Sequence, residues 1–228
     1  MKKVLVIAAH PDDEMLGCGG TIKKFINSGY EVVTAIVARG RPSEHHRIKK
    51  FSKLANKQLG IKKVIFLDYP NLRLETYPLH KIIETLCKLI EAYEPDVVLT
   101  HYHGDINRDH QTVFEAVLTA TRPLPGTKPA EILCFETVAC SEWGNHHREP
   151  FKPNLFVDIT DTIDDKIEAL RHYDLEMRPA PHPRSYEGIR MVAGVRGMSV
   201  GTNYAEAFEI CEYGSRPSLA DLHKLFPF

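Results

Sequence analysis

Two short segments of the sequence concentrate imidazole and carboxylate side chains. The first is His10-Pro11-Asp12-Asp13-Glu14, and the second is Asp105-Ile106-Asn107-Arg108-Asp109-His110. Imidazole nitrogens and carboxylate oxygens are ligands that suit Zn²⁺, and catalytic zinc sites use three protein ligands and leave one position open. A single His or Asp in a loop is usually a cap or a solvated turn residue. Two such clusters together favour a metal site.

Each cluster follows, within a few residues, an apolar segment that is typical of a buried strand. Residues 4–9 precede the first cluster, and residues 96–100 precede the second. In open parallel sheets, ligands bind beyond the carboxyl ends of the strands, where the loops converge. We therefore expect the two clusters to meet at one edge of a sheet.

The spacing of apolar residues predicts how the rest of the chain supports that edge. The first half alternates strands and helices, which implies right-handed βαβ units and a mostly parallel sheet flanked by helices. The C-terminal third is more elaborate, and no linker separates domains, so residues 1–228 are expected to form a single α/β domain. The predicted strands are residues 4–9, 31–38, 63–67, 96–100, 131–138 and 154–159, and the predicted helices are residues 21–28, 43–59, 79–93, 109–121, 161–174 and 185–195.

The composition excludes several classes of protein. The 228 residues are 43% hydrophobic and carry a formal net charge of -1, which lacks the excess of positive charge expected of a nucleic-acid binder. No apolar run reaches the roughly 20 residues of a membrane span. Five scattered cysteines give no disulfide framework. These features predict a cytoplasmic enzyme or binding protein with reduced thiols.

A glycine-rich segment, Gly17-Cys18-Gly19-Gly20, suggests a competing hypothesis of a dinucleotide-binding loop. That fingerprint requires a third glycine where this chain has Ile22, and the carboxylates of Asp12, Asp13 and Glu14 would repel a pyrophosphate. We expect the glycines instead to let the loop turn sharply into its helix.

Four segments together resemble the PIG-L/LmbE family of zinc-dependent de-N-acetylases. The first two are Ala9–Glu14 with its glycines, and residues 104–110. The others are Glu136 with Ser141-Glu142-Trp143, and His182-Pro183-Arg184-Ser185 with the residues from Arg196 to Phe208. The resemblance spans nearly the whole chain and implies a Rossmann-like fold. Its last two segments point to a branch associated with sugar metabolism.

The resemblance assigns roles to four of these residues. His10, Asp13 and His110 would bind one zinc ion per chain, and Asp12 would be the general base. Zinc lowers the pKa of a bound water to roughly 7, and the activated water would attack an acetamide carbonyl. The expected substrate is a small N-acetylated sugar or glycoconjugate, and the products are acetate and a free amine. Members of the family often form homo-oligomers.

One departure from the family pattern affects proton transfer. Many members have a histidine where this chain has Asn107, which can donate a hydrogen bond to substrate but cannot shuttle protons. We expect His182 to protonate the leaving amine, with His101 and His103 as further candidates, unless Asp12 returns its own proton.

Two further residues are candidates for supporting roles in the site. Asp109 is predicted to orient a metal ligand. Arg47 is either a substrate contact or a solvated helix residue.

Two alternative functions remain open at this point. A metal-dependent hydratase of an unsaturated dicarboxylic acid would use the same scaffold, and its substrate would need clustered cations such as Arg39, Arg41 and Arg47. A non-catalytic sugar- or nucleotide-binding module is the second alternative, but it would leave Asp12 without a task.

Overall fold

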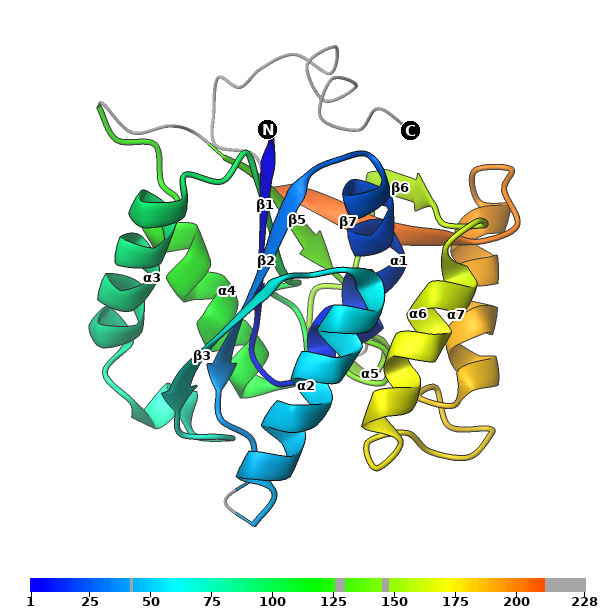
Figure 1. Ribbon diagram of the computed structural model, residues 1–228, viewed down its shortest axis with the longest axis horizontal. Helices are drawn as coiled ribbons and strands as arrows, with labels where there is room; N and C mark the ends of the chain where they lie inside the picture. The colour runs from blue at the N-terminus through cyan, green and yellow to red at the C-terminus, as the bar shows by residue number, and fades with distance from the viewer. Residues whose placement is uncertain (42, 126–129, 145–147, 212–228) are drawn as a thin grey trace.

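The computed structural model describes residues 1–41, 43–125, 130–144 and 148–211 and contains one seven-stranded sheet (Figure 1). Its strand order is β3-β2-β1-β4-β5-β7-β6, and every strand except β7 runs in the same direction. The predicted mostly parallel, Rossmann-like sheet is confirmed. The strands are β1 (Lys3–Ala8), β2 (Glu31–Ala38), β3 (Lys63–Tyr69), β4 (Val97–His101), β5 (Glu131–Phe135), β6 (Leu155–Asp158) and β7 (Ala205–Cys211).

Helices cover both faces of this sheet. Helices α1, α2, α6 and α7 pack on one face, and α3 and α4 pack on the other (Figure 1). The longer helices are α1 (Asp13–Asn27), α2 (His45–Leu59), α3 (Leu79–Tyr93), α4 (Arg108–Ala120), α6 (Ile163–Leu170) and α7 (Tyr186–Met198), and α5 (Ser141–Gly144) is a single turn. No helix within the described ranges is long and apolar enough to cross a membrane.

Strand β1 shows why the sheet needs both layers. Its side chains alternate between the two cores: Val4 and Val6 belong to the core under α1, and Leu5 and Ile7 belong to the core under α3 and α4. All four side chains are fully buried. Because both faces of the strand are covered, its sequence is a continuous aliphatic run rather than an alternation of apolar and polar residues.

The C-terminal third differs from its prediction in one strand. Residues 205–211 were not predicted to be a strand, yet they form β7, which pairs antiparallel with both β5 and β6. Its sequence, AEAFEIC, places glutamates at Glu206 and Glu209 and so lacks the continuous apolar run of a buried strand. Strand β5 also ends at Phe135, earlier than predicted, and α6 ends at Leu170.

The start of α1 was also predicted wrongly. The helix begins at Asp13, directly after the first His/Asp cluster, and not at Thr21. The glycines lie inside the helix and permit close packing: a Cβ on Gly17 would lie 2.2 Å from the Phe135 ring, and one on Gly20 would lie 2.9 Å from Ile159. The expectation that they form a turning loop was therefore wrong.

A buried ion pair bridges a break in α1 at Cys18, whose φ of -144° and ψ of 23° are not helical. Glu206 accepts hydrogen bonds from the backbone N–H groups of Gly20 at 3.0 Å and Thr21 at 2.7 Å. Lys166 donates to the carbonyl of Leu16 at 2.8 Å and to Glu206 at 2.7 Å. The pair therefore satisfies the donors and the acceptor that the break exposes.

Candidate metal centre and active site

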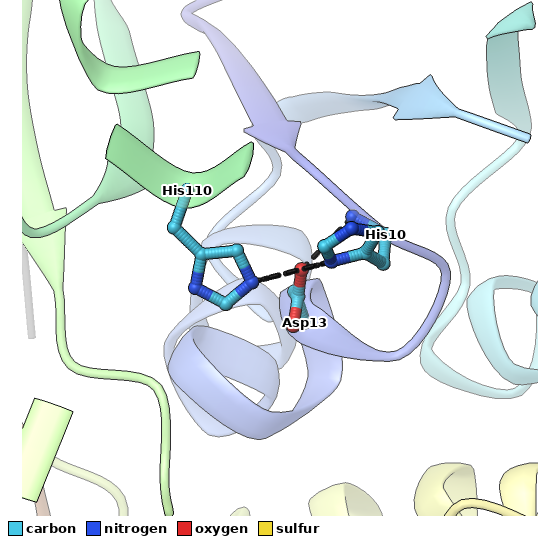
Figure 2. Close-up of side chains that lie close together, drawn as sticks. All are labelled: His10, Asp13 and His110. Carbon is cyan, nitrogen blue, oxygen red and sulfur yellow. Dashed lines mark hydrogen bonds and ion pairs between the residues drawn. The ribbon is translucent and has the colours of Figure 1, made fainter. Parts of the chain in front are cut away.

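Three side-chain atoms from the two predicted clusters converge at the carboxyl ends of β1 and β4. His10 Nδ1, Asp13 Oδ2 and His110 Nε2 lie 3.2 Å from one another in all three pairs (Figure 2). Two ligand atoms bonded to one tetrahedral zinc ion at about 2.0–2.1 Å would be about 3.3 Å apart. The spacing of the three atoms therefore fits a zinc-sized ion.

A carboxylate fixes the orientation of each of the two imidazoles. Asp109 accepts a hydrogen bond from His10 Nε2 at 2.9 Å, and Asp105 accepts one from His110 Nδ1 at 2.9 Å. Because an ionised carboxylate can only accept, each ring carries its proton on that side and turns a lone pair toward the other ligands. Asp109 thus contacts His10, one of the three candidate ligands.

The electrostatics of the cluster favour a positive charge at its centre. Burial opposes the charged form of His10, but hydrogen bonds to Asp109 and Asp13 raise its pKa to about 9. Burial likewise opposes the charged form of His110, but the charges of Asp13 and Asp105 raise its pKa to about 10. Burial favours neutral Asp13, yet the three neighbouring histidines hold its pKa well below the usual range. A divalent cation would supply the positive charge that protons otherwise bring.

His101 is close to this cluster but serves a structural purpose. It is fully buried and stacks on His110 with ring centroids 3.9 Å apart. Its Nε2 accepts a hydrogen bond from the backbone N–H of Ala9 at 2.8 Å, and Nδ1 lies 3.2 Å from Thr137 Oγ1. Burial lowers its pKa, so His101 is a neutral ring with both nitrogens engaged. This placement does not support His101 as the proton donor.

Asp12 combines a strained backbone with a position beside the candidate ligands. Its φ of 118° is rare for a residue with a side chain, and such conformations persist only where the surroundings enforce them. Its N–H donates to Glu14 Oε2 at 3.0 Å, and its carbonyl accepts from the N–H groups of Met15 and Leu16. With this backbone conformation Asp12 lines the pocket next to the cluster.

Glu14 anchors this strained turn from inside the protein. Its carboxylate is fully buried and accepts hydrogen bonds from Asn56 at 2.9 Å and Tyr173 at 2.8 Å. Burial raises the pKa of Glu14 to about 7, although these hydrogen bonds favour its charged form. The geometry of the Asp12 loop therefore depends on α2 and on the segment after α6.

Arg184 is the ionic partner of Asp12. Its guanidinium lies 3.2 Å from Asp12 Oδ2 and also contacts the carbonyl of Val138 at 3.3 Å. Burial raises the pKa of Asp12 to about 8, although the charge of Arg184 opposes this rise. Arg184 thus holds the carboxylate that faces the open side of the cluster.

A pocket opens beside the ligands and Asp12, and its charged groups are paired. Arg41 lies 3.5 Å from Glu44 and 3.9 Å from Glu176, and Arg184 contacts Asp12. The lining contains four carboxylates and only two guanidinium groups, an imbalance that a divalent ion would neutralise. The pocket is lined by His10, Pro11, Asp12, Asp13, Gly40, Arg41, Glu44, Ile48, Asn71, Leu72, Asn107, Glu176 and Arg184.

The structure brings Asn107 into the pocket but not Arg47. Asn107 caps α4 by accepting a hydrogen bond through Oδ1 from the N–H of Asp109 at 2.9 Å, and it lines the pocket. Arg47 is exposed on α2, where its guanidinium lies 5.4 Å from the centroid of the Phe51 ring. It is not among the residues that line the pocket, which supports the solvated-helix interpretation.

Two candidate proton donors lie outside the pocket lining. His182 accepts a hydrogen bond at Nδ1 from the N–H of Arg184 at 3.0 Å, and it packs edge-on against Trp143. His182 is thus two positions along the chain from Arg184, the ionic partner of Asp12. His103 is half-buried and lies 3.3 Å from the exposed carboxylate of Glu149.

The sequence interpretation missed three groups that complete the site. It named Arg184 only as part of a matched segment, and it assigned no role to Asp105 or Glu14. A signal for Asp105 was present, because a metal-bound histidine normally donates its second N–H to a carboxylate or carbonyl. No spacing rule connects Arg184 to Asp12, because their contact spans 172 positions.

Comparison with known proteins finds deacetylases among the relatives of this chain. A 223-residue match to diacetylchitobiose deacetylase from Thermococcus kodakarensis is 29% identical and covers 90% of this chain and 82% of the relative. A match to "Uncharacterized deacetylase YaiS" from Escherichia coli is also 29% identical and covers 75% of this chain and 90% of the relative.

Solved structures share the fold over almost the whole chain. N,N'-diacetylchitobiose deacetylase from Pyrococcus horikoshii, complexed with an inhibitor, gives a TM-score of 0.75 at 25% identity and covers 97% of this chain and 88% of its own. The 4-carboxy-2-hydroxymuconate hydratase from Pseudomonas putida also gives 0.75, at 22% identity, with 96% and 100% covered. The second similarity shows the fold alone. The model of the PIG-L family, GlcNAc-PI de-N-acetylase, matches residues 5–121, more than half of the chain, and the protein belongs to that family.

Proposed function

We propose that the protein is a zinc-dependent amidohydrolase that removes the N-acetyl group from an amino-sugar substrate and releases acetate and a free amine. The observation that carries the proposal is the triangle of His10, Asp13 and His110 ligand atoms, 3.2 Å on each side, next to the pocket-facing Asp12. Deacetylases among the relatives and structural neighbours support the same chemistry.

The three ligands would hold the ion, which supplies Lewis-acid activation of a water molecule and of the acetamide carbonyl. Asp12 accepts the proton of the attacking water, and Arg184 keeps the Asp12 carboxylate directed into the pocket. Asn107 has its Oδ1 engaged as a helix cap, so its amide nitrogen is the group that faces substrate. Proton transfer to the leaving amine then falls to Asp12 or to His182.

The charge pattern of the pocket favours a neutral sugar over a dicarboxylic acid. A dicarboxylate would require unpaired cations, but Arg41 and Arg184 already have carboxylate partners. Arg47 and the exposed Arg39 do not line the pocket. The hydratase alternative therefore lacks the cationic contacts that its substrate needs.

Metal analysis combined with acetate release tests the proposal. Purified protein should bind about one zinc ion per chain, and replacing any one of the three ligands with Ala should remove most of it. Asp12→Asn should retain the metal but deacetylate N-acetyl sugars about 10²–10⁴-fold more slowly, because the amide cannot accept the proton of water.

Two results would refute this function. The first is stoichiometric metal in all three alanine variants, which would exclude the ligand assignment. The second is hydration of an unsaturated acid without release of acetate and amine in equal amounts, which would identify a lyase. Full activity of Asp12→Asn would exclude Asp12 as the base.

A further inference from the structure

Trp143, the sole tryptophan of the sequence, is half-exposed and packs against His182. It lies on α5, and 52% of its surface is accessible. Its ring meets that of His182 edge-on, with centroids 5.5 Å apart and an angle of 84° between the planes. An indole combines a large apolar face with a single polar N–H, so an exposed indole is suited to binding a partly apolar ligand.

The turn of helix that carries Trp143 is fastened to the metal centre. Ser141 Oγ accepts a hydrogen bond from the N–H of Thr137 at 2.9 Å and lies 3.4 Å from Asp105 Oδ2. That same Asp105 oxygen binds the ligand His110. A Cβ on Gly144 would lie 2.7 Å from the carbonyl oxygen of Gly104, so α5 packs directly on this loop.

Two short connections place Trp143 beside the pocket. On one side, His182 contacts Trp143 and accepts a hydrogen bond from the N–H of Arg184, which lines the pocket. On the other side, Gly144 packs against the backbone of Ile106, and the next residue, Asn107, lines the pocket. Trp143 itself is absent from the lining. Trp143 is therefore separated from the pocket lining by His182 on one side and by the contact of Gly144 with Ile106 on the other.

We propose that Trp143 forms a second sugar subsite, which stacks the pyranose ring joined to the acetylated residue. The inference rests on the proposed function, since it extends the substrate from an amino sugar to an oligosaccharide of at least two rings. A pyranose presents a face of C–H groups, which are slightly positive, to the negative face of the indole. The hydroxyl groups at the ring edge remain free to hydrogen-bond to water or protein.

The surroundings of Trp143 favour a sugar over an alkyl chain. Its ring contacts His182, and the pocket residues that the two connections reach are Arg184 and Asn107; all three can form hydrogen bonds. Ile106, with 47% of its surface accessible, is the exposed apolar residue nearest along this loop. A lipid chain would need a continuous apolar surface, whereas a sugar needs one flat apolar face bordered by polar groups.

Fluorescence of the single tryptophan measures occupancy of this subsite directly. The Asp12→Asn protein, loaded with zinc, leaves the substrate intact while Trp143 reports binding. Titration with N,N'-diacetylchitobiose should change the emission saturably, and N-acetylglucosamine should require about tenfold more ligand, the difference expected from one aromatic stacking contact. Octyl N-acetylglucosaminide provides the comparison with an alkyl aglycone.

Kinetics of matched variants supply the second measurement. Trp143→Ala in the otherwise wild-type enzyme should raise KM for the disaccharide about tenfold with little change in kcat, and leave KM for N-acetylglucosamine nearly unchanged. Trp143→Phe should recover part of the loss, because it restores an aromatic face. Met191→Ala, which removes a 69% exposed side chain on α7, is the control and should have no effect.

The outcomes separate the subsite from the chemistry. Three results would overturn the subsite even if acetate is released normally. They are unchanged emission at saturating disaccharide, a stronger emission response to the octyl glycoside than to the disaccharide, and equal KM increases for both sugars in Trp143→Ala. The two proposals can also fail separately. If Asp12→Asn gives a saturable emission change but the wild-type protein releases no acetate from any sugar, the subsite is supported and the proposed reaction is refuted.

Discussion

The buried pair of Lys166 and Glu206 bridges the break in α1, and its loss should destabilise the whole protein. Only 4% of the Lys166 side chain and 3% of the Glu206 side chain are accessible to solvent. Glu206→Gln preserves the shape of the side chain but removes its charge. Lys166 then remains buried without a carboxylate, while Gly20 and Thr21 share a weaker acceptor.

The magnitude follows from these contacts. Removing one partner of a buried ion pair costs about 3–5 kcal/mol of unfolding free energy. The lower end applies here, because the amide oxygen of Gln still accepts one hydrogen bond. For a chain of this length each kcal/mol corresponds to about 2–4 °C, so a loss of about 3 kcal/mol lowers Tm by roughly 6–12 °C.

Thermal unfolding followed by circular dichroism measures this shift, and the more accessible pair Lys23–Asp165 provides a matched control. That pair also joins α1 to α6, at 3.4 Å, with 23% and 34% of the side chains accessible. Asp165→Asn should cost at most about 1 kcal/mol. Adding Lys166→Met to Glu206→Gln should recover part of the stability, since it removes the unpaired charge. A Tm loss in Glu206→Gln no larger than that in Asp165→Asn would refute the reasoning.

Three further predictions concern the site. Asp105→Asn and Asp109→Asn should each weaken zinc binding about 10–100-fold, because each carboxylate orients one of the proposed ligands. Competition with a chromophoric chelator measures the zinc affinity, and wild-type affinity in both variants would contradict the prediction. Arg41→Ala should raise KM for the sugar while Arg47→Ala leaves it unchanged, and the reverse result would restore Arg47 as the substrate contact. If His182 is the proton donor, His182→Ala should keep zinc but lower kcat a hundredfold or more and shift the basic limb of the pH–rate profile. A wild-type kcat with an unchanged profile would assign the transfer of that proton to Asp12.

The parallel half of the fold was predictable because local patterns determine it. Strands β1, β2 and β4 are buried on both faces, and their aliphatic runs were recognisable without knowledge of their neighbours. Strand β7 was not, because Glu206 belongs to a buried strand only through its contacts with α1 and Lys166. The start of α1 was missed for a related reason. Glycine disfavours a helix locally, and the Phe135 ring that requires Gly17 comes from a distant strand.

The residue types and their positions at strand ends, taken alone, determined the class of site. Two His/Asp clusters after two buried strands must meet in a parallel sheet, and His10, Asp13 and His110 do meet there. Tertiary structure decided which groups act on these residues. Contacts between residues far apart in the chain place Arg184 against Asp12 and Trp143 against His182. Such contacts depend on the packing of loops and helices onto the finished sheet, and no short-range periodicity encodes them.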